Sequence, residues 1–149
     1  MFYQMQEGYL TLEGEWQDQS VNMLVAHHLT VKGANLTVTR ESLPSGVGFL
    51  DYLTEQKKIL AEQLTDFNQE AEVPHIIDGR AARFLEFTWN NQGNPFHQMI
   101  MIIPEKDGIL SLTATVPGFM DEVSREALLN VMKSFRSGPA QAAQEGPAS

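Results

Sequence analysis

The stretch Arg83–Val116, RFLEFTWNNQGNPFHQMIMIIPEKDGILSLTATV, decides the fold of this chain. It contains three runs, at residues 83–89, 98–103 and 109–116. In these runs apolar residues either alternate with polar ones or make up most of the run. Such runs are typical of β-strands. Turn residues separate them at Asn90–Asn94 and at Glu105–Gly108. Connections this short cannot cross over the sheet, so the three strands are predicted to form an antiparallel meander.

The flanking sequence supplies further strands and two helices. Strands are predicted at Tyr9–Leu12, Val21–Ala26 and Leu36–Arg40. Apolar residues then recur at helical spacing within 47–67, with Ser45 as the predicted N-cap. A second helix is predicted over 121–135, with a buried stripe of Val123, Leu128, Val131, Met132 and Phe135. This order predicts an α+β fold, an antiparallel β-sheet packed with two main helices.

Length and composition predict one soluble domain. The 149 residues are 42% hydrophobic, which is enough for a core, and we expect a single domain over 1–136 with a disordered tail over 137–149. The tail lacks aromatic and branched aliphatic residues. No cysteine is present, which fits a reducing compartment. The N-terminus lacks the pattern of a secretory signal, and no apolar run reaches the roughly 20 residues of a membrane span.

The charge and the polar residues argue against several functions. A net charge of −9 is unsuited to nucleic acid and to anionic membranes, so we expect neither nucleic-acid binding nor direct membrane insertion. The four histidines follow no zinc-binding spacing, and no serine lies in a nucleophile elbow. We therefore expect no catalytic site, no metal and no cofactor, although a triad assembled from distant residues would leave no local pattern.

Two strands are apolar on both faces. In 97–103, Gln98, Ile100 and Ile102 share one face, while methionines and Ile103 occupy the other. The strand at Val21–Val25 is equally apolar on both sides. A half-exposed strand normally has one polar face. Either the protein covers both faces of these strands or a partner covers one of them.

Several segments resemble the DcrB-like family, and within it the Eag chaperones associated with effectors of bacterial type VI secretion. The resemblance lies in DQSVNML at 18–24, LTVTRESLP at 36–44, FTW at 87–89, HQ at 97–98 and LTAT at 112–115. It covers roughly residues 7–135, and it rests on the order and spacing of the motifs.

The resemblance implies a PsbP-like α/β/α sandwich and a binding function. Eag-type chaperones are homodimers whose concave, largely apolar sheet surface holds hydrophobic transmembrane helices near the N-terminus of a secreted effector. They keep these helices soluble in the cytoplasm before loading onto the secretion spike, and they are not enzymes. Envelope lipoproteins of the family carry a signal and a cysteine, so this chain is expected to belong to the cytoplasmic branch.

Seven residues are the candidates for client binding, and they lie on three predicted strands and the first helix: Val21, Met23, Val38, Gln56, Gln98, Ile100 and Ile102. The aliphatic members would line the apolar surface. Gln56 lies within the apolar stripe of the first helix, and its amide and that of Gln98 match family positions that would hydrogen-bond the bound helix. Val21 and Met23, rather than Asn22 and Leu24, are assigned to the client-binding face of their strand. A shift of one residue in the strand register would exchange the two faces.

Two other functions remain open from the residues alone. One is a PsbP-like assembly or regulatory module with a polar binding surface, which would bind an apolar dye weakly. The other is an enzyme or small-molecule carrier, which would need a deep pocket with convergent polar groups.

Overall fold

The computed structural model describes residues 1–106 and 108–139. The elements of this part of the chain are, in order, β1 (Phe2–Gln4), β2 (Tyr9–Thr11), β3 (Asn22–Val25), β4 (Asn35–Ser42), α1 (Phe49–Gln63), β5 (Asn68–Ile77), β6 (Arg80–Asn91), β7 (Asn94–Glu105), β8 (Gly108–Pro117) and α2 (Glu122–Lys133).

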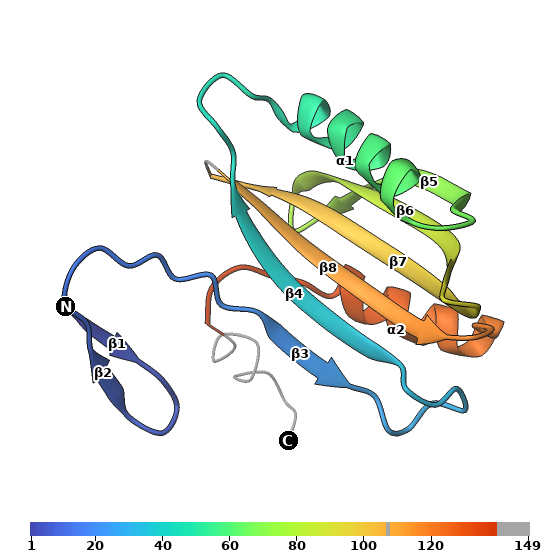
Figure 1. Ribbon diagram of the computed structural model, residues 1–149, viewed down its shortest axis with the longest axis horizontal. Coiled ribbons are helices and arrows are strands. Elements are labelled where there is room, and N and C mark those ends of the chain that lie inside the picture. The colour runs from blue at the N-terminus through green and yellow to red at the C-terminus, as the bar shows by residue number, and fades with distance from the viewer. Residues whose placement is uncertain (107, 140–149) are drawn as a thin grey trace.

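Six strands form the main sheet, in the order β3-β4-β8-β7-β6-β5, and all neighbours are antiparallel (Figure 1). The meander predicted over Arg83–Val116 is confirmed as β6, β7 and β8. Strand β4 joins the meander beside β8, although helix α1 and three strands separate the two in sequence. Strands β1 and β2 form a separate hairpin that projects from the sheet (Figure 1).

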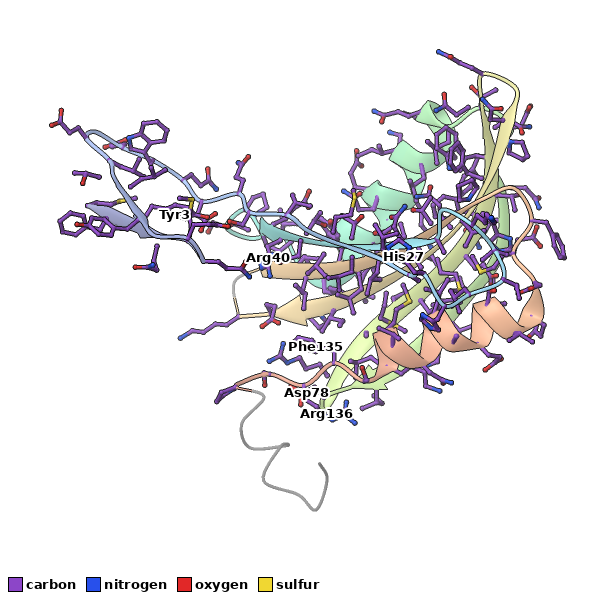
Figure 2. The ribbon with its side chains drawn as sticks, turned by 90° about the horizontal axis from the view of Figure 1, so that it is seen from below. Tyr3, His27, Arg40, Asp78, Phe135 and Arg136 are labelled. Atoms are coloured by element: carbon purple, nitrogen blue, oxygen red, sulfur yellow. The ribbon has the colours of Figure 1, made fainter. Side chains whose placement is uncertain are left out.

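The two helices pack on opposite faces of the sheet (Figure 2). The larger core lies between the sheet and α2, and includes Phe84, Met99, Met101, Leu112 and Met132. The smaller core lies under α1 and joins Leu53 to Leu85 and Ile102, with Ile109 beside them. The predicted α+β fold with two helices on an antiparallel sheet is therefore confirmed.

The helix ends differ in how they are capped. Helix α1 begins after Gly48, which offers no side-chain cap, so the prediction of Ser45 as N-cap is wrong. Helix α2 begins after Asp121, whose Oδ1 accepts a hydrogen bond of 2.8 Å from the backbone amide of Ser124. Such a cap satisfies an amide that has no partner within the helix.

The buried stripe of α2 differs from the predicted one. The fully buried residues are Ser124, Leu128 and Met132, whereas Val123 and Val131 are exposed. The prediction for these two valines is wrong, because the residues that face the sheet recur every four positions from Ser124 and the valines lie beside that row. Val123 and Val131 instead form an apolar outer strip on α2.

Strand β5 is missing from the sequence-based prediction. It starts soon after α1, carries a register irregularity between Gln69 and Ala71, and contains Pro74. A bulge and a proline interrupt the alternation that identifies strands, and both are typical of sheet edges.

The predicted disordered tail falls largely on residues 140–149, which lie outside the described residues. Just before it, Ser137 donates its backbone amide and its hydroxyl to Oδ2 of Asp78 at 3.1 and 2.8 Å. The domain limits of 1–136 stay a prediction. Within the described residues, neither helix combines the length and apolarity needed to cross a membrane.

Candidate functional site

The face of the sheet that carries α1 is only partly covered. Helix α1 packs against β6 and β7 (Figure 1), while β3 and β4 lie beyond it. The strand registers place one row of side chains across this face, from Leu85 under the helix through Ile100, Thr113 and Thr37 to Met23 at the edge. We call the uncovered part the open face.

Hydroxyl side chains form the middle of the open face. They come from adjacent strands β4 and β8, where Thr37 is opposite Thr113 and Thr39 is opposite Ser111. We call these four residues together with Thr115 the hydroxyl floor, and all five are partly exposed. The surface implied by the family resemblance was largely apolar, whereas the structure has a polar centre between apolar sides. The alternating threonines of 111–115 were the sequence signal for this floor.

A groove runs between α1 and the floor. It has a volume of about 160 Å³ and is lined by Gln56, Leu60, Ile100, Ile102 and Thr113, among others. The structure therefore brings Gln56, Ile100 and Ile102 together, as the sequence predicted for a shared surface. Ile102 is almost fully buried, so Ile100 contributes more of the accessible apolar lining.

Gln98 lies on the same face, next to the groove, but its amide already has partners. Its Oε1 accepts a hydrogen bond of 2.7 Å from Trp89 Nε1, and its Nε2 donates one of 2.8 Å to Thr115 Oγ1. The stacked rings of Trp89 and Phe96 hold this arrangement at the end of the strands. Each amide atom of Gln98 keeps one further hydrogen-bonding position.

The edge strand β3 supplies the apolar side of the open face. Met23 is 64% exposed and points to this face, because it pairs with Thr37. Val25 points the same way, and Val21, just before the strand, is also exposed. These side chains and the groove beside α1 border the hydroxyl floor from opposite sides.

Val38 does not share this surface. It pairs with Asn22 on β3 and Leu112 on β8, which places it on the α2 face, against the larger core. A side chain on β4 alternates with its neighbours, so Thr37 and Val38 cannot face the same way. The grouping of Val38 with Met23 and Ile100 in one surface is therefore wrong, while the other six candidates lie on the α1 side or at its edge.

Acidic residues gather where the groove opens near the start of α1. A wide hollow of about 860 Å³ is lined there by Asp18, Glu41, Asp51, Glu55 and Glu105, with Arg40 and Lys106 among them. Tyr52 donates a hydrogen bond of 2.6 Å to Glu41 Oε2 between the hollow and the groove. Burial and then the neighbouring carboxylate of Glu41 raise the pKa of Tyr52, so its hydroxyl stays protonated.

An ion-pair cluster fixes α1 over the sheet. Lys57 Nζ lies 3.0 Å from Glu72 Oε1 on β5, and Arg83 Nη1 on β6 lies 2.7 Å from Glu72 Oε2. Burial alone would raise the pKa of Glu72, but hydrogen bonds from these two cations lower it. The cluster thus holds the helix that forms one wall of the groove.

A second cluster fixes α2 on the opposite face. Glu86 is 4% exposed and accepts hydrogen bonds from Arg125 Nε and Nη2 at 2.8–3.0 Å. His97 Nε2 lies 2.7 Å from Glu86 Oε2. Within residues 1–106 and 108–139, no group of three or more acidic or histidine side chains could hold a metal ion.

The family follows from the comparison with known sequences. The family model for DcrB matches residues 7–134, which is most of the chain. The chain belongs to the DcrB family. This DcrB-family chain is also 25% identical, over 114 residues, to a Pseudomonas aeruginosa protein named effector EagT6, covering 76% of this chain and 79% of that one.

Solved structures confirm the PsbP-like fold. A crystal structure of a Pseudomonas aeruginosa protein of unknown function matches with a TM-score of 0.74 at 22% identity, covering 93% of this chain and 97% of that one. The solution structure of cyanobacterial PsbP from Synechocystis sp. PCC 6803 matches with a TM-score of 0.51 at 13% identity, covering 76% and 79%. At these identities the similarity is one of fold.

Proposed function

We propose that this DcrB-family chain is an effector-associated chaperone of bacterial type VI secretion. It binds the hydrophobic transmembrane helices near the N-terminus of a secreted effector and keeps them soluble in the cytoplasm until the effector is loaded onto the secretion spike. The protein acts by binding and not by catalysis. The similarity to EagT6 supports this assignment.

The observation that carries the proposal is the open face with its exposed apolar edge. Met23, Val21 and Val25 lie in water on one side of the hydroxyl floor, and Ile100 lies in the groove on the other side. Burying one large aliphatic side chain stabilises a complex by about 1.5–3 kcal/mol. A client helix laid on this face would cover both apolar sides at once.

Polar groups of the open face are placed to orient such a helix. Gln56 lines the groove beside Ile100, and Gln98 keeps one free position on each amide atom. The hydroxyl floor offers hydrogen bonds to polar side chains of the client. Hydrogen bonds of this kind add about 0.5–1.5 kcal/mol each, so they favour one orientation more than they increase affinity.

The proposal is tested by co-expression with a client of known chemistry. The probe is the N-terminal segment of a type VI effector that contains predicted transmembrane helices, fused to a soluble tag. The wild-type chain should keep this fusion in the soluble fraction, and the Met23→Asp variant should reduce the soluble complex at least tenfold, because a charge would face the bound apolar helix.

The matched control is Ile76→Asp on β5. Ile76 is 74% exposed, at the opposite edge of the sheet, so the same chemical change there should leave the complex unaffected. If Met23→Asp and Ile76→Asp behave alike, the open face is not the client site. Failure of the wild-type chain to hold the fusion in solution would contradict the chaperone assignment itself.

A further inference from the structure

The seven methionines of the chain divide into a buried group and an exposed group. The buried group lies in the larger core, where each side chain is at most 4% exposed: Met99, Met101, Met120 and Met132. The other three, Met1, Met5 and Met23, are 63%, 37% and 64% exposed. An oxidant dissolved in water therefore reaches these three thioethers far more readily than the four in the core.

Met23 is the exposed methionine that belongs to the open face. Met1 precedes β1, and Met5 lies in the turn between β1 and β2. Both are thus in the hairpin that extends beyond Arg40 and away from the body (Figure 2). Met23 lies on β3, opposite Thr37 of the hydroxyl floor. Oxidation at Met23 would change the proposed client site, whereas oxidation in the hairpin would not.

The strand pairing places the thioether of Met23 close to a hydroxyl donor. Ala26 donates its backbone amide to Ala34 on β4. Hydrogen-bonded and non-hydrogen-bonded pairs alternate along antiparallel strands, so the pair of Met23 and Thr37, three positions further along, is non-hydrogen-bonded. Opposed Cβ atoms in such pairs are about 4.5–5.5 Å apart. The Thr37 hydroxyl is therefore placed to donate to an oxygen added to the Met23 sulfur.

Met23 is also the middle of the apolar edge of the open face. Val21 and Val25 lie two residues before and after it, and they are 57% and 52% exposed. A methionine suits this place because its flexible, polarizable side chain adapts to irregular apolar partners. Its sulfoxide is polar, and a hydrogen bond from Thr37 would draw it toward the hydroxyl floor. The client helix would then lose its apolar contact at the centre of the edge and cover a polar group instead, which is unfavourable.

We propose that Met23 is a reversible oxidation site that controls client binding. In the proposed step, the sulfur of Met23 attacks one oxygen of hydrogen peroxide, so that an S–O bond forms and the O–O bond breaks. The proton of the transferred oxygen passes to the other oxygen, which leaves as water. The sulfur gives up two electrons, and the peroxide takes them up. A methionine sulfoxide reductase reverses the change with two thiols, which become a disulfide while the oxygen leaves as water.

Client binding and oxidation of Met23 then oppose each other. A bound helix covers the thioether and shields it from peroxide, and the sulfoxide weakens the binding of the helix. Coupling between two such events is reciprocal. This regulation rests on the proposed chaperone function, to which it adds a control of the client site. Free chaperone molecules would stop accepting clients in oxidising conditions, while loaded complexes would persist.

Peptide mass spectrometry after treatment with hydrogen peroxide tests the selectivity. In the free protein, the sulfoxide of Met23 should form at least tenfold faster than those of Met99 and Met132, which are fully buried. In the co-expressed complex with the effector fusion, oxidation of Met23 should slow at least fivefold, while Met5 in the hairpin should react as before. Equal rates at Met23 and Met132, or equal rates at Met23 with and without the client, would contradict the proposal.

Client capture is measured with protein that has been oxidised and then freed of peroxide. The effector fusion is synthesised with purified translation components free of sulfoxide reductases, and its soluble fraction is compared between treated and untreated chaperone. The oxidised wild-type chain should hold at least fivefold less fusion in solution, and reductase with a thiol should restore the capture. Met23→Gln introduces a neutral polar side chain of similar length. It should match the oxidised wild type and should not respond to peroxide.

Two leucine variants serve as controls, each compared with its own untreated form. Peroxide should not change the capture by Met23→Leu, because the oxidisable sulfur is gone. Met5→Leu lacks an exposed methionine outside the site and should respond to peroxide as the wild type does. No loss in the wild type, or an equal loss in Met23→Leu, would overturn the oxidation proposal and leave the chaperone proposal standing. Failure of the untreated wild-type chain to hold the fusion would contradict the chaperone proposal and the regulation that rests on it.

Discussion

Glu86 is a buried carboxylate whose neighbours determine its charge. Its oxygens accept three hydrogen bonds from Arg125 and lie 2.7 Å from His97 Nε2. Removing one partner of a buried pair leaves the other charge uncompensated, which commonly costs 3–5 kcal/mol. The pair of Glu86 and Arg125 therefore helps to attach α2 to the sheet. It lies on the face opposite the proposed client site.

The Arg125→Ala variant should lower the free energy of unfolding by about 3 kcal/mol, because Glu86 would keep only His97 as a partner. Urea denaturation at pH 7 measures this change. Lys133→Ala, in the last turn of the same helix, is the control and should change stability by less than about 1 kcal/mol. Equal losses from both variants would mean that the ion pair is no stronger than a surface charge.

Acid should weaken the fold through the same carboxylate. Burial favours a raised pKa for Glu86, but hydrogen bonds from Arg125 and His97 outweigh it and lower the pKa below its ordinary value. A group of this kind stabilises the folded state above its unfolded pKa, and the contribution is lost as the pH falls through its folded pKa. Unfolding free energy should thus decrease below about pH 4.

The Glu86→Gln variant should lose stability at pH 7 and show a shallower decrease in acid. Part of the decrease should persist, because Glu72 and Asp121 also have lowered pKa values. Urea denaturation between pH 7 and pH 3 measures both effects. An acid dependence identical to that of the wild type would show that Glu86 does not carry this contribution.

Individual side chains also show where sequence-based prediction stops. The helical spacing placed Gln56 beside the apolar stripe of α1, and the structure has it in the groove with Ile100. Val38 was misplaced because alternation shows that Thr37 and Val38 face opposite ways but not which of them shares a face with Met23. That relation depends on the pairing of β3 with β4. The two hydrogen bonds of Gln98 likewise depend on partners from two other strands.

At the scale of elements, α1 is attached to the sheet by a small apolar core and by the cluster around Glu72. Lys57 reaches across from the helix to this carboxylate, while Arg83 approaches from β6. The only ion pair in this cluster that reaches α1 is the one between Lys57 and Glu72, and a partly exposed pair of this kind contributes on the order of 1 kcal/mol or less.

Lys57→Met should loosen α1 without unfolding the protein. We expect hydrogen exchange of α1 amides to rise a few-fold, since local opening needs little free energy when a helix has few contacts. Lys58→Met, an exposed change on the same helix, is the control. Unchanged exchange in Lys57→Met, measured by mass spectrometry, would show that the other contacts of α1, such as those of Leu53 and Tyr52, hold the helix without this ion pair.

Elements with regular patterns were predictable, and the interrupted ones were not. The meander was predictable because strands β6, β7 and β8 are joined by tight turns with recognisable residues. Strand β5 was missed because its bulge and Pro74 break the alternation. Of the two strands of the β1–β2 hairpin, only β2 was predicted, as a strand that begins at Tyr9. Strand β1 was missed because a strand of three residues is too short to show an alternating pattern.

At the scale of the whole molecule, many of the exposed apolar side chains belong to the N-terminal part of the chain. The first 25 residues carry Phe2, Tyr9, Trp16, Met23 and Leu24 in exposed positions. Exposed apolar surface on this scale indicates binding partners. The proposed client on the α1 side would cover the part of it that Met23 contributes.

The place of β4 in the sheet has a consequence for biosynthesis. Asn35 pairs with Thr115 and Ser42 with Gly108, so the β4 strand finds its neighbour only when the ribosome has released nearly the entire chain. Distant pairings of this kind slow folding. A nascent or prematurely terminated polypeptide would contain β3, β4 and α1 without the β8 part of the hydroxyl floor and without the strands on which α1 packs, so only finished molecules would compete for freshly made effectors.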